Sequence, residues 1–328
     1  MRQLSGGHRG DAATDRTDRD KAVADFDAFV RAGIDTFDMG PETCGYGPAE
    51  SIVGDYVKSL PAGAAKPLLF TKLCCVGQEQ SSPSAEWVRG RVDRALSRLG
   101  RPARLDLLQV YWNDLSYAQQ LIDMSRYVQD ERDAGRVGAV AFTNFDTARL
   151  EAIRAAGVEV AAHQIQFSLL DRRPVRQQLA WCAESGCKLL PYGVLAGGLL
   201  SDKYLGATQE SVRLDTYSKQ KYASVLGRAA GPGGWDWFQR LLKTLRAVGD
   251  AHSGASVANV AARWVLDHDA VGAIILGARN ANNVRQHQQL FAMSRLTDAD
   301  RAAIDAVLAD GAQPKADTYQ WERGGGVF

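Results

Sequence analysis

Short apolar runs alternate with longer stretches of helical period along almost the whole chain, and this alternation constrains the fold most strongly. The runs lie at residues 34–38, 67–72, 105–111, 137–142, 160–166, 188–192 and 273–277. After each run, apolar residues recur at the spacing that places them on one face of a helix. Such a pattern predicts parallel strands joined by crossover helices. The sequence therefore predicts the α/β class.

Seven strands are one fewer than a (β/α)8 TIM barrel requires. Residues 1–7, before the first predicted helix, could form an abbreviated first strand. Residues 196–234 then form a long connection after the seventh strand. Because 328 residues is an ordinary length for one barrel, we expect a single domain over residues 1–328.

The charge balance favours a small-molecule partner. The chain has 39 Lys and Arg against 38 Asp and Glu, without a basic block, so we expect neither nucleic acid nor a membrane surface as a partner. No run approaches the roughly 20 apolar residues of a membrane helix. The sequence does not indicate an oligomeric state.

The cysteines and the first residues bear on the compartment. Five cysteines, at positions 44, 74, 75, 182 and 187, show no CxxC spacing, so we expect reduced thiols and no metal site. The first 20 residues lack the apolar core of a signal peptide and contain several aspartates. We therefore expect a cytoplasmic protein, with an organelle as the alternative if the chain starts downstream of its native beginning.

Polar residues stand at the predicted ends of the strands, where barrel enzymes place their chemistry. They are Asp38, Lys72, Tyr111, Asn144, Gln164, Tyr192 and Gly277. A buried aspartate beside a buried lysine is costly unless the two pair, and such a pair can shift the pKa of a nearby phenol. From position alone, a purely structural salt bridge remains an equal alternative.

Fragments over nearly the whole chain resemble the aldo-keto reductases. They include GIDTFD, GYGPAESIVG, LLFTK, LDLLQVYW, HQIQFSLLDRRP, LLPYGVLAGGLLSDKY and ILGARNANNV, in the order of the family. The resemblance implies a (β/α)8 barrel, NADPH/NADP+ as the cofactor and the reversible reduction of a small-molecule aldehyde or ketone.

The resemblance makes Asp38 and Lys72 two of the four catalytic residues of the family, which are Asp, Tyr, Lys and His. The family tyrosine usually stands in DxAxxYG, but here DMGPETCGYG puts Tyr46 three residues further along and Thr43 at the family spacing. Tyr111 occupies the place of the histidine. We predict that Tyr46 is the proton donor and that Tyr111 supports or replaces it, although either could be a tyrosine without a catalytic role.

The resemblance also implies a set of cofactor residues. Thr143, Asn144 and Gln164 would hold the nicotinamide carboxamide, and Tyr192 would stack on its ring. The backbone of Gly193, Leu195 and Gly197 would line the pyrophosphate, with Lys203 nearby. Arg279, after the turn at Gly277, would bind the 2′-phosphate with Asn283 on the same early helix turns, although both could instead be ordinary solvated residues at a helix start. Asn144 could instead cap the helix that follows it. Because of the two tyrosine departures, a regulatory NADPH-binding protein with weak activity remains the alternative, like the potassium-channel β-subunits that resemble this family.

Overall fold

The computed structural model describes residues 19–101, 103–277 and 280–319. Contacts divide these residues into two units, which we describe separately. The first holds residues 19–164 and 280–284, and the second holds residues 165–277 and 285–319.

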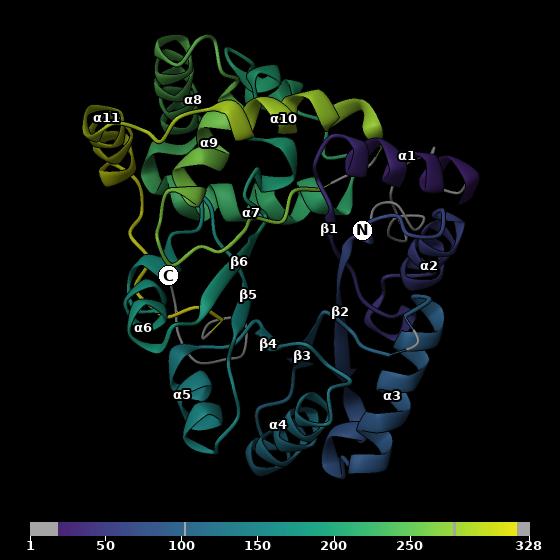
Figure 1. Ribbon diagram of the computed structural model, residues 1–328. Helices are drawn as coiled ribbons and strands as arrows, with labels where there is room; N and C mark the ends of the chain where they lie inside the picture. Colours follow the sequence, from purple (N-terminus) through teal and green to yellow (C-terminus); the bar gives the residue numbers. More distant parts are fainter. Residues whose placement is uncertain (1–18, 102, 278–279, 320–328) are drawn as a thin grey trace. The chain divides into compact units, whose positions relative to one another are not determined.

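The first unit is a parallel sheet with helices between its strands (Figure 1). Its elements are α1 (Arg19–Arg31), β1 (Thr36–Asp38), η1 (Glu42–Cys44), α2 (Ala49–Ser59), β2 (Leu68–Cys75), η2 (Gly77–Ser81), α3 (Ala85–Arg98), β3 (Leu107–Trp112), α4 (Ala118–Asp133), β4 (Val140–Thr143), α5 (Thr147–Ala155), the start of β5 (Ala162–Gln166) and η8 (Ala281–Asn283). The strands pair in parallel in chain order from β1 to β5. This alternation confirms the predicted α/β class.

An aromatic cluster fixes the short strand β1. Phe26 of α1 is fully buried, and its ring lies 5.0 Å from that of Phe37 in β1 and 5.7 Å from that of Tyr56 in α2. Burying such rings contributes about 1.5–3 kcal/mol each. Because side chains alternate along a strand, Asp38 points to the face opposite Phe37.

The predicted helix ends agree with the structure. Gly100, Gly135 and Gly157 follow α3, α4 and α5 with φ of 62°, 76° and 86°. Glycine adopts these left-handed angles without the steric cost of a Cβ, so it terminates a helix readily. Each of these helices therefore ends at its glycine, and the chain can turn back toward the next strand of the sheet.

The second unit continues from the end of β5. It contains η3 (Arg173–Val175), α6 (Gln178–Ser185), β6 (Lys188–Tyr192), η4 (Ala196–Gly198), η5 (Asp202–Tyr204), η6 (Gln209–Ser211), α7 (Tyr217–Ala230), η7 (Gly231–Gly233), α8 (Gly234–Ala251), α9 (Val257–Leu266), α10 (Val284–Ala292) from its second residue onward, and α11 (Asp298–Ala309). After β5, the N–H of Phe167 donates to the carbonyl oxygen of Tyr192 at 3.2 Å. The long connection predicted after β6 is present and contains the helix α7.

The prediction of a regular strand at residues 273–277 is wrong. This part of the chain forms only isolated parallel bridges, from Val271 to Leu189 and from Ile275 to Tyr192. Residues 271–277 are all at least partly exposed, so they lack the two-sided burial that stabilises an inner parallel strand. The predicted abbreviated strand at residues 1–7 lies outside the described residues.

Within the part of the chain that the structure describes, no helix is long and apolar enough to cross a membrane.

Candidate active site

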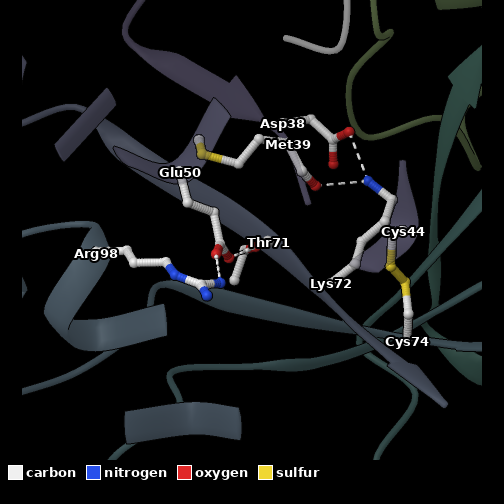
Figure 2. The surroundings of a disulfide bond; sticks show 8 residues. All are labelled: Asp38, Met39, Cys44, Glu50, Thr71, Lys72, Cys74 and Arg98. Atoms are coloured by element: carbon white, nitrogen blue, oxygen red, sulfur yellow. Dashed lines mark hydrogen bonds and ion pairs between the residues drawn. A yellow bond between two sulfur atoms is a disulfide. The ribbon is translucent and has the colours of Figure 1, made fainter. Parts of the chain in front are cut away.

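A buried ion pair joins Asp38, the last residue of β1, to Lys72 in the interior of β2 (Figure 2). The Nζ of Lys72 lies 2.8 Å from Oδ1 of Asp38 and donates to the carbonyl oxygen of Met39 at 2.9 Å. The side chains of Lys72 and Asp38 are only 4% and 11% exposed. Burial alone would lower the pKa of Lys72, but the charge of Asp38 and the contact with Tyr46 outweigh it and raise that pKa. Lys72 is therefore an ammonium ion at neutral pH.

Two amide side chains complete the surroundings of Asp38. Its Oδ2 accepts hydrogen bonds from Nε2 of Gln109 at 2.6 Å and from Nε2 of Gln164 at 2.8 Å. The Nε2 of Gln164 also donates to Oε1 of Gln109 at 2.6 Å. Since a carboxylate only accepts hydrogen bonds, Asp38 fixes which end of each amide faces it. The oxygen of Gln164 is then available to accept a hydrogen bond from a ligand.

The sequence interpretation missed Gln109. It stands two residues before Tyr111, the predicted end of its strand, and residues two apart in a strand point to the same face. It also pairs with Lys72 in the register of β2 and β3. Alternation within the strand was the signal that could have found it.

Tyr46 lies beside the ion pair. The ammonium of Lys72 is 4.8 Å from the centre of the Tyr46 ring, and the two side chains are close enough for a hydrogen bond that helps to raise the pKa of Lys72. Thr43, at the spacing usual in the resembling sequences, is exposed. Tyr111 is half-buried and pairs with Cys74 in the register of β2 and β3. This pair lies two residues further along the strands than the pair of Lys72 and Gln109.

The prediction of five reduced cysteines is wrong for two of them. Cys44 and Cys74 form a disulfide, with their Cα atoms 6.0 Å apart, whereas Cys75, Cys182 and Cys187 are buried thiols. This pairing depends on where β2 places Cys74, which no motif in the sequence indicates. The cysteines therefore no longer support the expected compartment.

Thr143 and Asn144 follow β4 directly. The hydroxyl of Thr143 and the N–H of Asn144 both donate to the carbonyl oxygen of Gln164, at 3.2 and 3.0 Å. Asn144 has a φ of 66°, a left-handed angle that asparagine tolerates better than most residues. Asp146 caps α5 by accepting from the N–H of Arg149, so the alternative of Asn144 as the helix cap is wrong.

A buried histidine that the sequence interpretation missed also supports this turn. The Nε2 of His163 accepts a hydrogen bond from the N–H of Phe145 at 3.0 Å. His163 therefore helps to hold the bend that presents Thr143 and Asn144.

The second unit contains the residues predicted to line the pyrophosphate. Gly193 and Gly197 have φ of 71° and 64°, and both face Tyr222 of α7. Leu195 lies between these two glycines, and Tyr192, at the end of β6, is half-buried with the ammonium of Lys221 5.1 Å from its ring centre. Lys203 is exposed in η5.

Two of the three residues predicted at the 2′-phosphate lie within the described part of the chain. Gly277 is exposed in the second unit, and Asn283 is exposed in η8 of the first. Arg279 lies outside the described residues. Among the residues that the structure describes, no three His, Cys, Asp or Glu side chains are grouped to hold a metal ion.

The arrangement around Asp38 fits a ligand that carries a carboxamide. Such a group needs a partner that accepts from its NH2 and one that donates to its oxygen. The oriented amide of Gln164 offers the acceptor, and the side chain of Asn144 can offer a donor. The pair of Lys72 and Tyr46 adds a cation and a hydroxyl, which together can deliver a proton to an oxygen atom.

Comparison with known proteins places this chain in a family. The profile of the Aldo/keto reductase family matches residues 4–309. Flagellar radial spoke protein 5 of Chlamydomonas reinhardtii is 32% identical over 193 residues, a match that spans 53% of this chain but 36% of that protein. Aldo-keto reductase YhdN of Bacillus subtilis is 25% identical over 303 residues, which cover 89% of this chain and 85% of that protein.

A solved structure shares the fold. Glycerol dehydrogenase AKR11B4 of Gluconobacter oxydans superimposes with a TM-score of 0.76 at 24% identity, over 96% of this chain and 91% of that one. The family match extends over both units, and the chain therefore belongs to the Aldo/keto reductase family, oxidoreductases that reduce carbonyl compounds with a nicotinamide cofactor.

Proposed function

We propose that this protein reduces an aldehyde or ketone to an alcohol with NADPH, reversibly, and that Tyr46 donates the proton. One observation carries the proposal: Tyr46 lies against the ammonium of Lys72, which in turn pairs with the buried Asp38. A structural salt bridge alone would not need a phenol at that position.

The roles of the residues follow from their chemistry. A bound reduced nicotinamide would supply a hydride to the carbonyl carbon. Tyr46 transfers its hydroxyl proton to the carbonyl oxygen, and the Lys72 ammonium stabilises the phenolate that remains. Asp38 keeps Lys72 charged in its buried site. In the oxidation direction Tyr46 takes the proton back from the alcohol.

The cofactor residues are proposed on the same basis. Thr143, Asn144 and Gln164 would hold the carboxamide and Tyr192 the ring. The backbone of the loop after β6, with Lys203, would meet the pyrophosphate, whereas Gly277, Arg279 and Asn283 would meet the 2′-phosphate and so favour NADPH over NADH. Among similar proteins, one from Escherichia coli is named an NADH-specific methylglyoxal reductase, and an aldo-keto reductase of Klebsiella pneumoniae was solved with NADPH. The preference therefore needs a direct measurement.

Cofactor fluorescence and carbonyl turnover test the proposal together. We expect NADPH to bind with a fluorescence change, NADH to bind more weakly, and at least one member of an aldehyde and ketone panel to consume NADPH. Absence of NADPH binding would refute the proposal. Equal affinity for both cofactors would refute the role of Arg279 alone.

Two variants identify the proton donor. Tyr46→Phe should lower kcat by about 10²–10⁴, because it removes the acid. Tyr111→Phe should lower it by only about tenfold, the value of one orienting hydrogen bond. The reverse order would assign proton donation to Tyr111.

A regulatory NADPH-binding protein is the second candidate, favoured by one observation. Tyr111 stands where the resembling sequences have a histidine, so the residue that would orient a carbonyl differs. NADPH binding without turnover of any carbonyl in the panel would support this candidate.

A further inference from the structure

The loop from Asp38 to Tyr46 is longer than the corresponding loop of the family motif DxAxxYG. Eight positions separate Asp38 from Tyr46, three more than in DxAxxYG. A longer loop has more conformations to lose on closing, so a side chain at its far end is harder to hold at one point. The protein must therefore contain contacts that hold Tyr46 at Lys72.

The ends of this loop are anchored by hydrogen bonds and an ion pair. At its start, the N–H of Met39 donates to the carbonyl oxygen of Phe70 at 2.9 Å. At its end, the buried carboxylate of Glu50 in α2 accepts from the hydroxyl of Thr71 at 2.6 Å and pairs with Arg98 at 3.2 Å (Figure 2). These contacts fix where the loop leaves and enters regular structure, but not the residues between.

The disulfide fixes the middle of the loop. Cys74 stands two residues after Lys72 in β2 and so points to the same face of the strand. Cys44 stands two residues before Tyr46. The bond thus ties the segment next to Tyr46 directly to the strand that carries Lys72, as Figure 2 shows for Cys44, Cys74 and Lys72.

Gly40 provides the space that the Tyr46 ring occupies. A Cβ on Gly40 would lie 2.9 Å from Cδ2 and 3.0 Å from Cε2 of Tyr46, closer than real Cβ contacts allow. Gly40 stands where DxAxxYG has its alanine. The ring can therefore rest against the backbone only because this position carries no side chain.

We propose that Gly40 and the Cys44–Cys74 disulfide are positioning elements, which together hold Tyr46 against Lys72 in spite of the three additional residues. This inference rests on the proposed function, in which Tyr46 is the proton donor. It makes turnover dependent on the oxidation state of one cysteine pair. A dithiol reductant would transfer two electrons and two protons to the bridge, giving two thiols and the cyclic disulfide of the reductant.

The test compares the double variant Cys44→Ser/Cys74→Ser with Cys75→Ser as a matched control. We expect the double variant to lose about ten- to a hundredfold in kcat with little change in NADPH affinity, because the proton donor moves while the cofactor residues stay. Dithiothreitol should lower wild-type turnover to the same level and leave the double variant unaffected. The Cys75→Ser variant should behave as the wild type does.

Alkylation and hydrogen exchange provide measurements that do not depend on turnover. Mass spectrometry of the unfolded, unreduced protein should find three alkylated cysteines, and five after reduction. Breaking the bond should speed amide exchange within residues 40–47 and leave β2 and β3 unchanged. Five alkylated cysteines before reduction, or unchanged exchange in the loop, would overturn the inference.

A double-mutant cycle separates positioning from general stability. Gly40→Ala should lower kcat by about tenfold in the wild type and have no further effect in Tyr46→Phe, since the residue it acts through is gone. Equal losses in both backgrounds would overturn the inference. If the oxidised wild type turns over no carbonyl while the exchange contrast is present, the proposed function fails and the positioning of the loop stands.

Discussion

The connections after β1 and after β6 hold their residues in opposite ways. The first, residues 39–48, is short and is joined to β2 by a disulfide. The second, residues 193–216, contains no cysteine, has left-handed glycines at Gly193, Gly197, Gly198 and Gly206, and packs against Tyr222. A proton donor must keep one side-chain atom in place, whereas a loop that offers backbone N–H groups needs glycine conformations instead. In the proposed function the first loop presents a side chain and the second presents backbone N–H groups, so a disulfide suits the first and glycines suit the second.

The largest expected difference concerns the ion pair beside each connection. Lys72→Met should abolish most turnover and lower the free energy of unfolding by about 3–5 kcal/mol, because Asp38 stays buried without its partner. Lys219→Met is the matched control, since Lys219 pairs with Asp215 at 2.6 Å but the aspartate is 48% exposed. That change should cost at most about 1 kcal/mol.

Urea unfolding and steady-state kinetics check both variants. The contribution of Lys72 should persist up to pH of about 10.4 and disappear above it, because a raised pKa favours the folded state until the pH passes the folded value. Equal destabilisation by the two variants would mean that the buried pair of Lys72 and Asp38 contributes no more to stability than the exposed pair of Lys219 and Asp215.

Gln109→Met should have the next largest effect. Removing its amide takes one buried hydrogen bond from Asp38 and one from Gln164, at a cost of about 1–3 kcal/mol. We expect the dissociation constant of NADPH, measured by fluorescence titration, to rise about five- to a hundredfold. Gln119→Met, an exposed change in α4, serves as the control. An unchanged dissociation constant would show that the orientation of Gln164 does not depend on Gln109.

The glycines after β6 allow strain and crowding to be separated. Gly193→Ala adds a Cβ 2.7 Å from a ring carbon of Tyr222 at a φ of 71°, whereas Gly198→Ala adds one in open space at a φ of 93°. Thermal unfolding should show a loss of about 1 kcal/mol for Gly198→Ala and about 2–3 kcal/mol for Gly193→Ala. Equal losses would remove Tyr222 as the support of this connection.

The smallest effect is expected at Cys75, which adjoins the disulfide but points away from it. Burial raises the pKa of its thiol to about 12, so it should remain protonated at pH 8. Iodoacetamide should then leave Cys75 unmodified in the folded protein over hours and modify it on unfolding, as peptide mass spectrometry can show. Rapid labelling would mean that Cys75 is accessible to solvent in the folded protein although it adjoins the disulfide.

Lys72 and Gln164 lie inside β2 and β5 and not at their predicted ends, but the sequence predicts the parallel strands, the helix ends and the place of Asp38 at the end of β1 correctly. These features depend on local periodicity and on the rule that parallel strands end at one edge, both of which can be read from one chain. The strand at residues 273–277 was expected on the same grounds and is not formed, because its burial depends on neighbours that periodicity does not reveal.

The remainder of the site depends on register. Cys44 and Cys74 are 30 residues apart, and only the placement of β2 brings them together. Gln109 reaches Asp38, 71 residues away, because β3 pairs with β2 at Lys72. Alternation along β3 places Gln109 on the same face as Tyr111, but which residues that face meets follows from packing in three dimensions.

The carboxylate of Asp38 receives donors from β2, β3 and β5. A slip of β3 by a single residue would turn Gln109 away from this carboxylate and send an apolar neighbour, Leu108 or Val110, in its place. The chain could still be compact and rich in helix and strand, yet the carboxylate would lose its donor from β3 and keep only those from β2 and β5. The proposed cofactor binding would therefore report whether β3 has joined the sheet in its native register.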